Sequence, residues 1–233
     1  MRYLLGNWKS NGNGALLDAF SSQWPKFPNT IQVGLALPFP WLTHPFSCAW
    51  RGAQNVSAFG PGAFTGEVHA GMLKELALDF CLVGHSERRH LMGETVAHTA
   101  QKVAALIEQT ILPVFCVGET LAERQAGQLE TVLERQLEPL RAIKASVLIA
   151  YEPVWAIGTG VAATPDDADQ AHSWIRNWCL AQGLVVPPIL YGGSVSPQNA
   201  HQLAQIASID GFLVGGASLK PDPFFEIGAQ LAR

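Results

Sequence analysis

The chain has 233 residues, of which 48% are hydrophobic and 15% are charged, and its formal net charge is −4. This composition excludes an intrinsically disordered chain, because so many apolar side chains require a packed core. The small negative charge, with no block of like charges, argues against nucleic acid and anionic membranes as partners. The length is large for one ordinary core and small for two, so we expect one domain over residues 1–233.

The four cysteines lie far apart and form no CxxC pair. Cys81 and Cys116 stand in apolar runs, which is typical of small buried side chains in a reducing compartment. The apolar run before the sequence GNWK at 6–9 is too short for a signal peptide. No run approaches the roughly 20 apolar residues that a membrane span needs. We therefore expect a cytoplasmic protein with no membrane contact.

Short apolar runs recur along the chain, and each is followed by a turn and then by a helical pattern. Several runs are hydrophobic throughout rather than alternating, which is typical of strands covered on both faces. We expect eight strands, at residues 3–6, 32–36, 50–54, 80–83, 112–116, 147–151, 189–191 and 211–214.

Helical spacing of apolar residues is clearest at 95–109, 129–140, 166–182, 197–207 and 224–231, with weaker signals at 15–24 and 40–46. Thr164 and Ser196 are candidate N-caps, because each precedes a proline that a first helical turn tolerates. Eight strand-then-helix units without a long linker predict one closed parallel (β/α)8 barrel. The pattern alone leaves an open, doubly wound sheet as an alternative.

Unusual polar residues follow the strands rather than the helices. Asn7 and Lys9 follow the first strand, His85 follows the fourth and Glu152 follows the sixth. In a barrel these positions meet at the C-terminal rim, where such folds build their active sites. Taken one at a time, each could be an ordinary turn or helix-cap residue.

The residue types at this rim suit proton transfer at carbon. Glu152 stands between an apolar strand end and Pro153, and a carboxylate in such surroundings can act as a base toward a proton next to a carbonyl group. The developing oxyanion then needs hydrogen-bond donors, for which His85, Lys9 and Asn7 are the candidates. A preorganised donor is typically worth about 3–4 kcal/mol in the transition state.

Glycine-rich turns at 157–160, 192–194 and 214–216 can expose backbone N–H groups to a phosphate, although each could also be a simple tight turn. The long segment 153–164 is either a lid that closes through Gly158 or an ordinary surface loop. The sequence has no GxxxxGK[ST], no HExxH, no GxGxxG after a strand and no Cys/His cluster with metal spacing. We therefore expect chemistry without a cofactor or a metal.

Several motifs, which span the whole chain, carry a resemblance to a known family. They are GNWK at 6–9, GAFTGE at 62–67, VGHSERR at 83–89, CVGE at 116–119, AYEPVWAIGTG at 150–160, YGGSV at 191–195 and GFLVGGASL at 211–219. Together they resemble the triosephosphate isomerases, which have the TIM-barrel fold. A glutamate base, a neutral histidine and a closing loop in this family are a standard worked example of tuned catalytic groups.

The resemblance implies interconversion of dihydroxyacetone phosphate and D-glyceraldehyde 3-phosphate through an enediol, as in glycolysis and gluconeogenesis. It makes Glu152 the base and His85 the neutral electrophile, kept uncharged by a helix that begins at Ser86. Lys9 and Asn7 would orient the phosphorylated triose. Ser86 would hold Glu152 before closure.

The resemblance also implies supporting groups and a partner. Glu87 would pair with Lys9, and the phosphate would be held by Gly158, Ser194, Gly215 and Gly216. Residues 62–67 resemble a long loop through which Thr65 reaches the Asn7 and Glu87 of a second copy, so we expect a homodimer.

Two departures from the family pattern lie near the expected site. Ser10 stands where methionine is common, and residues 161–163 differ from the usual lid hinge. The alternatives are a pentulose-phosphate epimerase, a class I aldolase or a non-catalytic barrel. The first would require metal ligands at strand ends, the second a Schiff-base lysine near the sixth strand. The third would be signalled by the loss of Lys9, His85 or Glu152, and all three are present.

Overall fold

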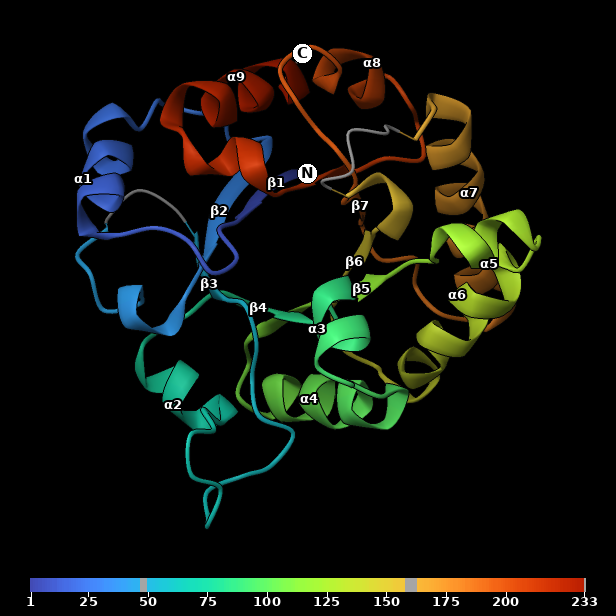
Figure 1. Ribbon diagram of the computed structural model, residues 1–233, viewed down its shortest axis with the longest axis horizontal. Helices are drawn as coiled ribbons and strands as arrows, with labels where there is room; N and C mark the ends of the chain where they lie inside the picture. The colour runs from blue at the N-terminus through green and yellow to red at the C-terminus, as the bar shows by residue number, and fades with distance from the viewer. Residues whose placement is uncertain (47–49, 158–162, 233) are drawn as a thin grey trace.

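A closed barrel of parallel strands forms the centre of the molecule. The computed structural model describes residues 1–46, 50–157 and 163–232. The strands pair in chain order, and β8 pairs with β1, so the sheet closes on itself (Figure 1). They are β1 (Arg2–Asn7), β2 (Ile31–Leu37), β3 (Trp50–Ala53), β4 (Phe80–Val83), β5 (Leu112–Val117), β6 (Leu148–Tyr151), β7 (Ile189–Tyr191) and β8 (Gly211–Val214). The predicted closed barrel is confirmed, and the open sheet is excluded.

Alternate residues of each strand point into the barrel, and the others face the helices. On β4, Phe80 and Leu82 belong to the interior cluster, whereas Cys81 and Val83 pack outward. Glycines make room for the largest interior ring: a Cβ atom on Gly52 would lie 2.4 Å from the ring of Phe80. The interior is therefore a packed core rather than a channel.

Helices form the outer layer around the strands (Figure 1). They are α1 (Gly14–Gln23), α2 (Ala70–Glu75), α3 (Ser86–Leu91), α4 (Val96–Glu108), α5 (Leu121–Gln125), α6 (Leu129–Leu137), α7 (Pro165–Ala181), α8 (Ala200–Ala204) and α9 (Pro221–Leu231). Short 3-10 turns are η1 (Phe39–Trp41), η2 (Glu138–Ala142), η3 (Val154–Ala156) and η4 (Gly216–Leu219). Four of the five clearest predicted helices are confirmed with small shifts at their ends, and the weak signal at 40–46 is only the turn η1.

The helix predicted at 197–207 is much shorter, and Ser196 is not its N-cap. The side chain of Asn199 accepts a hydrogen bond from the N–H of Ser196 at 2.8 Å, which builds a turn before the helix. The helix α8 then covers only Ala200–Ala204, so Pro197 stands in the turn. Thr164, by contrast, caps α7 as predicted, and its hydroxyl accepts from the N–H of Asp167.

The connection from β3 to α2 departs from the compact ring and extends away from it (Figure 1). It includes the exposed residues Phe59, Phe64 and Thr65. None of the helices in the described ranges is both long enough and apolar enough to span a bilayer.

Candidate active site

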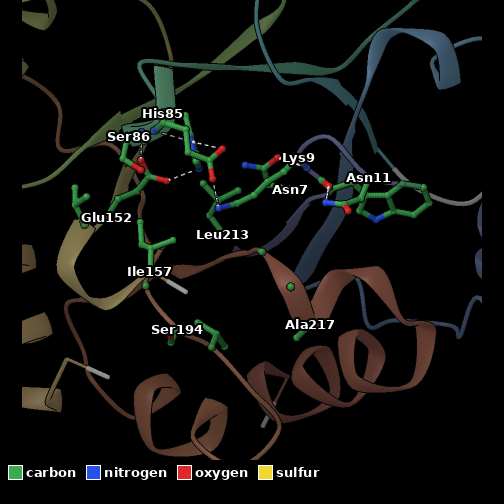
Figure 2. Close-up of a pocket in the computed structure, with 18 of the residues that line it drawn as sticks. Asn7, Lys9, Asn11, His85, Ser86, Glu152, Ile157, Ser194, Leu213 and Ala217 are labelled. Atoms are coloured by element: carbon green, nitrogen blue, oxygen red, sulfur yellow. Dashed lines mark hydrogen bonds and ion pairs between the residues drawn. The ribbon is translucent and has the colours of Figure 1, made fainter. Parts of the chain in front are cut away.

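A hollow of about 650 Å³ lies at the C-terminal ends of the strands. Figure 2 shows side chains from several strand ends turned toward one another in it. Its lining includes most of the predicted site residues: Asn7, Lys9, His85, Ser86, Glu87, Glu152, Ser194, Gly215 and Gly216. The structure therefore brings together residues from nearly the whole length of the chain, from Asn7 to Gly216.

Strand alternation explains why two of these side chains reach the hollow. On β6, Leu148 and Ala150 point into the barrel, and Glu152 is the next position in the same alternation. On β1, Asn7 follows Leu5 in the same way. Each polar side chain thus takes the last inward position of its strand, where the packed core ends.

The carboxylate of Glu152 is buried, and both of its oxygen atoms have partners. The side chain is 2% exposed, and Oε1 lies 2.9 Å from Nε2 of His85. Oε2 accepts a hydrogen bond from the backbone N–H of Ser86 at 2.8 Å (Figure 2). The contact predicted between Ser86 and Glu152 is present, and the donor is the main chain at the start of α3 rather than the hydroxyl.

His85 is the N-cap of α3, and its two ring nitrogens have different roles. Nδ1 accepts a hydrogen bond from the N–H of Glu87 at 3.3 Å, so this nitrogen carries no proton. The proton of a neutral ring then lies on Nε2, which faces Glu152. The helix N-terminus therefore favours a neutral ring in one particular tautomer.

The helix N-terminus favours a neutral His85, whereas the negative charges near this residue raise its pKa and so favour the protonated ring. Burial by itself lowers the pKa of His85, but the facing Glu152 carboxylate raises it, with a smaller contribution from Glu87, and the net pKa shift is upward. The expectation that the helix alone keeps this imidazole uncharged is therefore incomplete. Burial is the largest single cause, and the upward direction of the net pKa shift comes chiefly from the Glu152 carboxylate next to His85.

Lys9 is held over the hollow by a strained main chain and an ion pair. Its φ angle is +52°, a left-handed conformation that is uncommon for a residue with a side chain, and its N–H donates to Oδ1 of Asn7 at 3.0 Å. Its Nζ lies 2.5 Å from Oε1 of Glu87, the contact that the family resemblance implied. The pair is partly exposed, so its contribution is to orientation more than to stability.

The opposite wall of the hollow is built from the turns that follow β7 and β8. Ser194 donates its hydroxyl to the carbonyl of Ala156 at 2.6 Å, which ties the β7 turn to the turn after β6. Gly215 precedes the short turn η4, and a Cβ atom on Gly216 would meet no other atom within 4 Å. These turns present main chain, rather than bulky side chains, to the hollow.

Two predicted site residues are not placed there by the structure. Thr65 is exposed on the extended connection, where it lines a separate shallow hollow with Phe59, Phe64 and Met92. Gly158 and the hinge at 161–163 lie outside the described residues. The predicted lid therefore stays a prediction.

Comparison with known proteins decides the family. The model of the triosephosphate isomerase family matches residues 2–231. The chain belongs to the triosephosphate isomerase family. It is 46% identical to the triosephosphate isomerase of Ralstonia nicotianae, with 97% of each chain covered, and 45% identical to that of Cupriavidus taiwanensis, with 97% and 98% covered. The triosephosphate isomerase of Nitrosomonas eutropha is 43% identical, with 97% and 96% covered. The chain is accordingly an isomerase, as its motifs predicted.

Some residues of this triosephosphate isomerase site were not found from the sequence. Asn11 lines the hollow and donates its amide to the carbonyl of Trp8 at 3.0 Å. Glu119 is fully buried behind the site, where it accepts from the hydroxyl of Tyr151 at 3.0 Å and from Nε1 of Trp155 at 2.9 Å. The CVGE motif pointed to Glu119, but its partners become visible only in the folded chain.

Within residues 1–46, 50–157 and 163–232, no three His, Cys, Asp or Glu side chains are grouped so that they could hold a metal ion. The absence of a metal and of a cofactor in the reaction stays a prediction from the sequence.

Proposed function

We propose that the chain interconverts dihydroxyacetone phosphate and D-glyceraldehyde 3-phosphate by moving one proton between two adjacent carbons. The observation that carries the proposal is the pairing of a buried carboxylate with a histidine at the mouth of the barrel, with Glu152 Oε1 2.9 Å from His85 Nε2. Membership of the triosephosphate isomerase family supports the same reaction, because the relatives bear that name.

In the proposed reaction Glu152 takes the proton from the carbon that bears the hydroxyl group. The electron pair of the broken C–H bond forms the carbon–carbon double bond, and the carbonyl electrons move to oxygen. The Nε2–H of His85 donates its proton to that oxygen, which becomes a hydroxyl, and Nε2 then takes the proton of the hydroxyl group on the first carbon. The electrons of that O–H bond form the new carbonyl, and the electrons of the carbon–carbon double bond take the proton back from Glu152 at the neighbouring carbon. Donors placed in advance for a developing oxyanion are typically the largest catalytic term.

Charge coupling between these two groups supports the roles. The Glu152 carboxylate raises the pKa of His85. Once Glu152 has taken a proton, that cause disappears; burial, the largest cause, and Lys9 then lower the pKa of His85, and only Glu87 still raises it. A neutral imidazole with its proton on Nε2 is therefore favoured at the moment when an enediolate needs a donor.

The remaining predicted residues bind the substrate in this proposal. Lys9 supplies a positive charge near the carbonyl oxygen and the phosphate, and Asn7 fixes the main chain of Lys9. The turns that contain Ser194, Gly215 and Gly216 offer backbone N–H groups to the phosphate. Gly158 would complete that cradle on closure of the segment that follows Glu152.

A coupled assay of triose phosphate interconversion, run with and without a chelator, tests the proposal. Glu152→Gln should lower kcat by at least the ~10²–10⁴-fold typical of a general base, because it removes the proton acceptor and keeps the shape. Glu130→Gln is the matched control, since Glu130 is exposed on α6 and does not line the hollow. Near-full turnover of Glu152→Gln would show that the base is another group. If the wild-type protein does not interconvert the two triose phosphates, the proposed function is wrong.

We also infer a homodimer that uses the extended connection between β3 and α2. The rings of Phe59 and Phe64 stack on each other with centroids 4.5 Å apart, yet both remain more than one third exposed. An exposed aromatic pair next to Thr65 indicates a surface that another chain covers.

The mass in solution tests this inference. Thr65→Arg should shift the protein from the mass of two chains to that of one in light scattering, because it places a charge in the buried contact. Thr131→Arg on the exposed face of α6 serves as the control. A wild-type protein with the mass of one chain at micromolar concentration contradicts the dimer. The cytoplasmic location stays a prediction.

A further inference from the structure

The main chain around Gly118 lacks a strand partner on one side. Strand β5 pairs with β4 only as far as Phe115, which faces Val83, because the chain then leaves β4 to begin α3. The edge of β5 that faces β4 is thus left with unpaired backbone groups inside the protein. Such groups need other partners, since an unpaired buried N–H or C=O is costly.

A side chain from the outer helical layer takes the place of the missing strand. Gln136 on α6 accepts a hydrogen bond from the N–H of Gly118 at 2.8 Å and donates one to its C=O at 2.9 Å. The amide of Gln136 thus pairs with one residue in the manner of a neighbouring strand. Gln136 is 5% exposed, so water does not compete for these bonds. Figure 1 shows α6 in the outer ring, beside β5.

Residues 117–119 have a second edge, opposite the one that Gln136 covers, and this edge holds the main chain of Glu152. The N–H of Glu152 donates to the carbonyl of Val117 at 2.7 Å, and the N–H of Val154 donates to the carbonyl of Glu119 at 3.1 Å. Gly118 lies between these two anchor points, and a Cβ atom built on it would lie only 1.7 Å from the backbone oxygen of Glu152. The position of Gly118 therefore sets the position of the Glu152 main chain.

We propose that Gln136 is a positioning residue for Glu152, acting through the main chain of Gly118. The amide holds Gly118 from the helical side, and the flanking carbonyls of Val117 and Glu119 transmit that position to the residue that carries the base. The inference rests on the proposed function, because it predicts that loss of the Gln136 amide lowers the turnover of triose phosphate. Neither the motifs nor the lining of the hollow includes Gln136.

A second side chain closes the same edge nearer to His85. Arg89 on α3 donates through Nη2 to the carbonyl of Cys116 at 3.0 Å and through Nε to the carbonyl of Gly84 at 2.7 Å. Arg89 thus joins the ends of β4 and β5, through a residue of β5 that lies two positions before Gly118. The base is held from the Gln136 side and the imidazole from the Arg89 side, so the two can be perturbed separately.

Gln136→Met tests the inference, because methionine keeps the length of the side chain and removes both hydrogen bonds. The expected result is a fall in kcat of ~10- to 100-fold, the size that a displacement of about 1 Å can cause. The KM for the triose phosphate and inhibition by inorganic phosphate should stay within about twofold, since the turns after β7 and β8 are untouched. Gln136→Glu should fall between wild type and Gln136→Met, because a carboxylate still accepts from the Gly118 N–H.

Leu133→Ala on the same helix is the matched control, since Leu133 is fully buried and has no polar group to offer to Gly118. It should lower the melting temperature while leaving kcat within about twofold. The inference is wrong if kcat of Gln136→Met stays within twofold of wild type. It is also wrong if, in Gln136→Met, inhibition by inorganic phosphate weakens by the same factor as kcat falls. A fall in kcat of Leu133→Ala as large as that of Gln136→Met would contradict it as well. Should Gln136→Met not fold, Gln136→Glu is judged by the same criteria. Inactive wild-type protein would instead reject the proposed function.

Discussion

Lys102→Met should measure how much a buried ion pair near the candidate active site contributes to stability. Glu94 precedes α4 and has a side chain that is 3% exposed, and the side chain of Lys102 on α4 is 7% exposed. Glu94 accepts hydrogen bonds from Lys102 Nζ, from Arg88 Nε at 2.8 Å and from the N–H of Gly84 at 2.9 Å. Lys102 Nζ also donates to Oδ1 of Asn55 at 2.8 Å.

The expected loss follows from what remains after the substitution. Removal of one partner from a buried pair typically costs 3–5 kcal/mol, because the other charge stays buried without compensation. In Lys102→Met the carboxylate of Glu94 keeps Arg88, so we expect about 3 kcal/mol, the lower end of the range. Glu94→Gln leaves the ammonium of Lys102 without a carboxylate, so its loss should be larger.

The pH dependence supplies an independent check with a defined sign. Burial raises the pKa of Glu94, but Lys102 and Arg88 lower it by more, and the net value lies below the ordinary 4.5. A carboxyl group whose pKa is lower in the folded chain adds stability above pH 4.5, and that stability is lost as the pH falls through the folded pKa. Lys102→Met removes much of the downward pKa shift of Glu94. The difference in free energy of unfolding between wild type and this variant should therefore become smaller below pH 4.5.

Urea denaturation at one fixed chain concentration gives the free energies of unfolding, because the proposed dimer would make them concentration-dependent. The double variant Glu94→Gln/Lys102→Met should lose less than the sum of the single losses, by roughly 1–3 kcal/mol. A loss below 1 kcal/mol for Lys102→Met at pH 7, or strict additivity, would refute the assignment of this pair.

Two further predictions concern histidines. His85→Gln should lower kcat by ~10²–10³-fold, the usual cost of one lost oxyanion donor, with KM changed far less; steady-state kinetics that show a change in KM alone would contradict its role. Burial lowers the pKa of His172 to about 3. Between about pH 6.5 and 3, this histidine is therefore protonated in the unfolded chain but neutral in the folded chain. The free energy of unfolding accordingly falls by ~1.4 kcal/mol for each unit by which the pH is lowered in this range. His172→Phe should remove this contribution in urea denaturation between pH 7 and 4, and an unchanged slope would count against it.

The strands and the rim residues could be predicted because both depend on local sequence. A buried parallel strand is a short apolar run, and the first polar residue after it marks the C-terminal rim, as Asn7, His85 and Glu152 show. Barrel closure could not be read in this way. It depends on pairs such as Tyr3 with Gly211, which are separated by nearly the whole chain.

The resemblance implied the supporting roles of Ser86 and Glu87, but Gln136 escaped prediction because its partners are backbone groups that no pattern marks. A glutamine on an amphipathic helix such as α6 reads as a solvated residue, yet Gln136 is buried against Gly118. The helix at 197–207 failed for a related reason. The side chain of Asn199 competes for the backbone of Ser196, and apolar spacing does not report such competition.

The pairing of Glu152 with His85 has a consequence for the order of events in the proposed reaction. Both carboxylate oxygens are occupied here, one by the imidazole and one by the N–H of Ser86, which is how a carboxylate tolerates 2% exposure. A substrate whose carbonyl oxygen needs the same Nε2 must first separate Glu152 from His85. Substrate binding therefore frees the Glu152 carboxylate and the Nε2–H of His85 in one movement. In the proposed reaction the carboxylate then faces the C–H group, and Nε2–H faces the carbonyl oxygen. The backbone anchors at Val117 and Glu119 let the side chain of Glu152 make that movement while its main chain stays fixed.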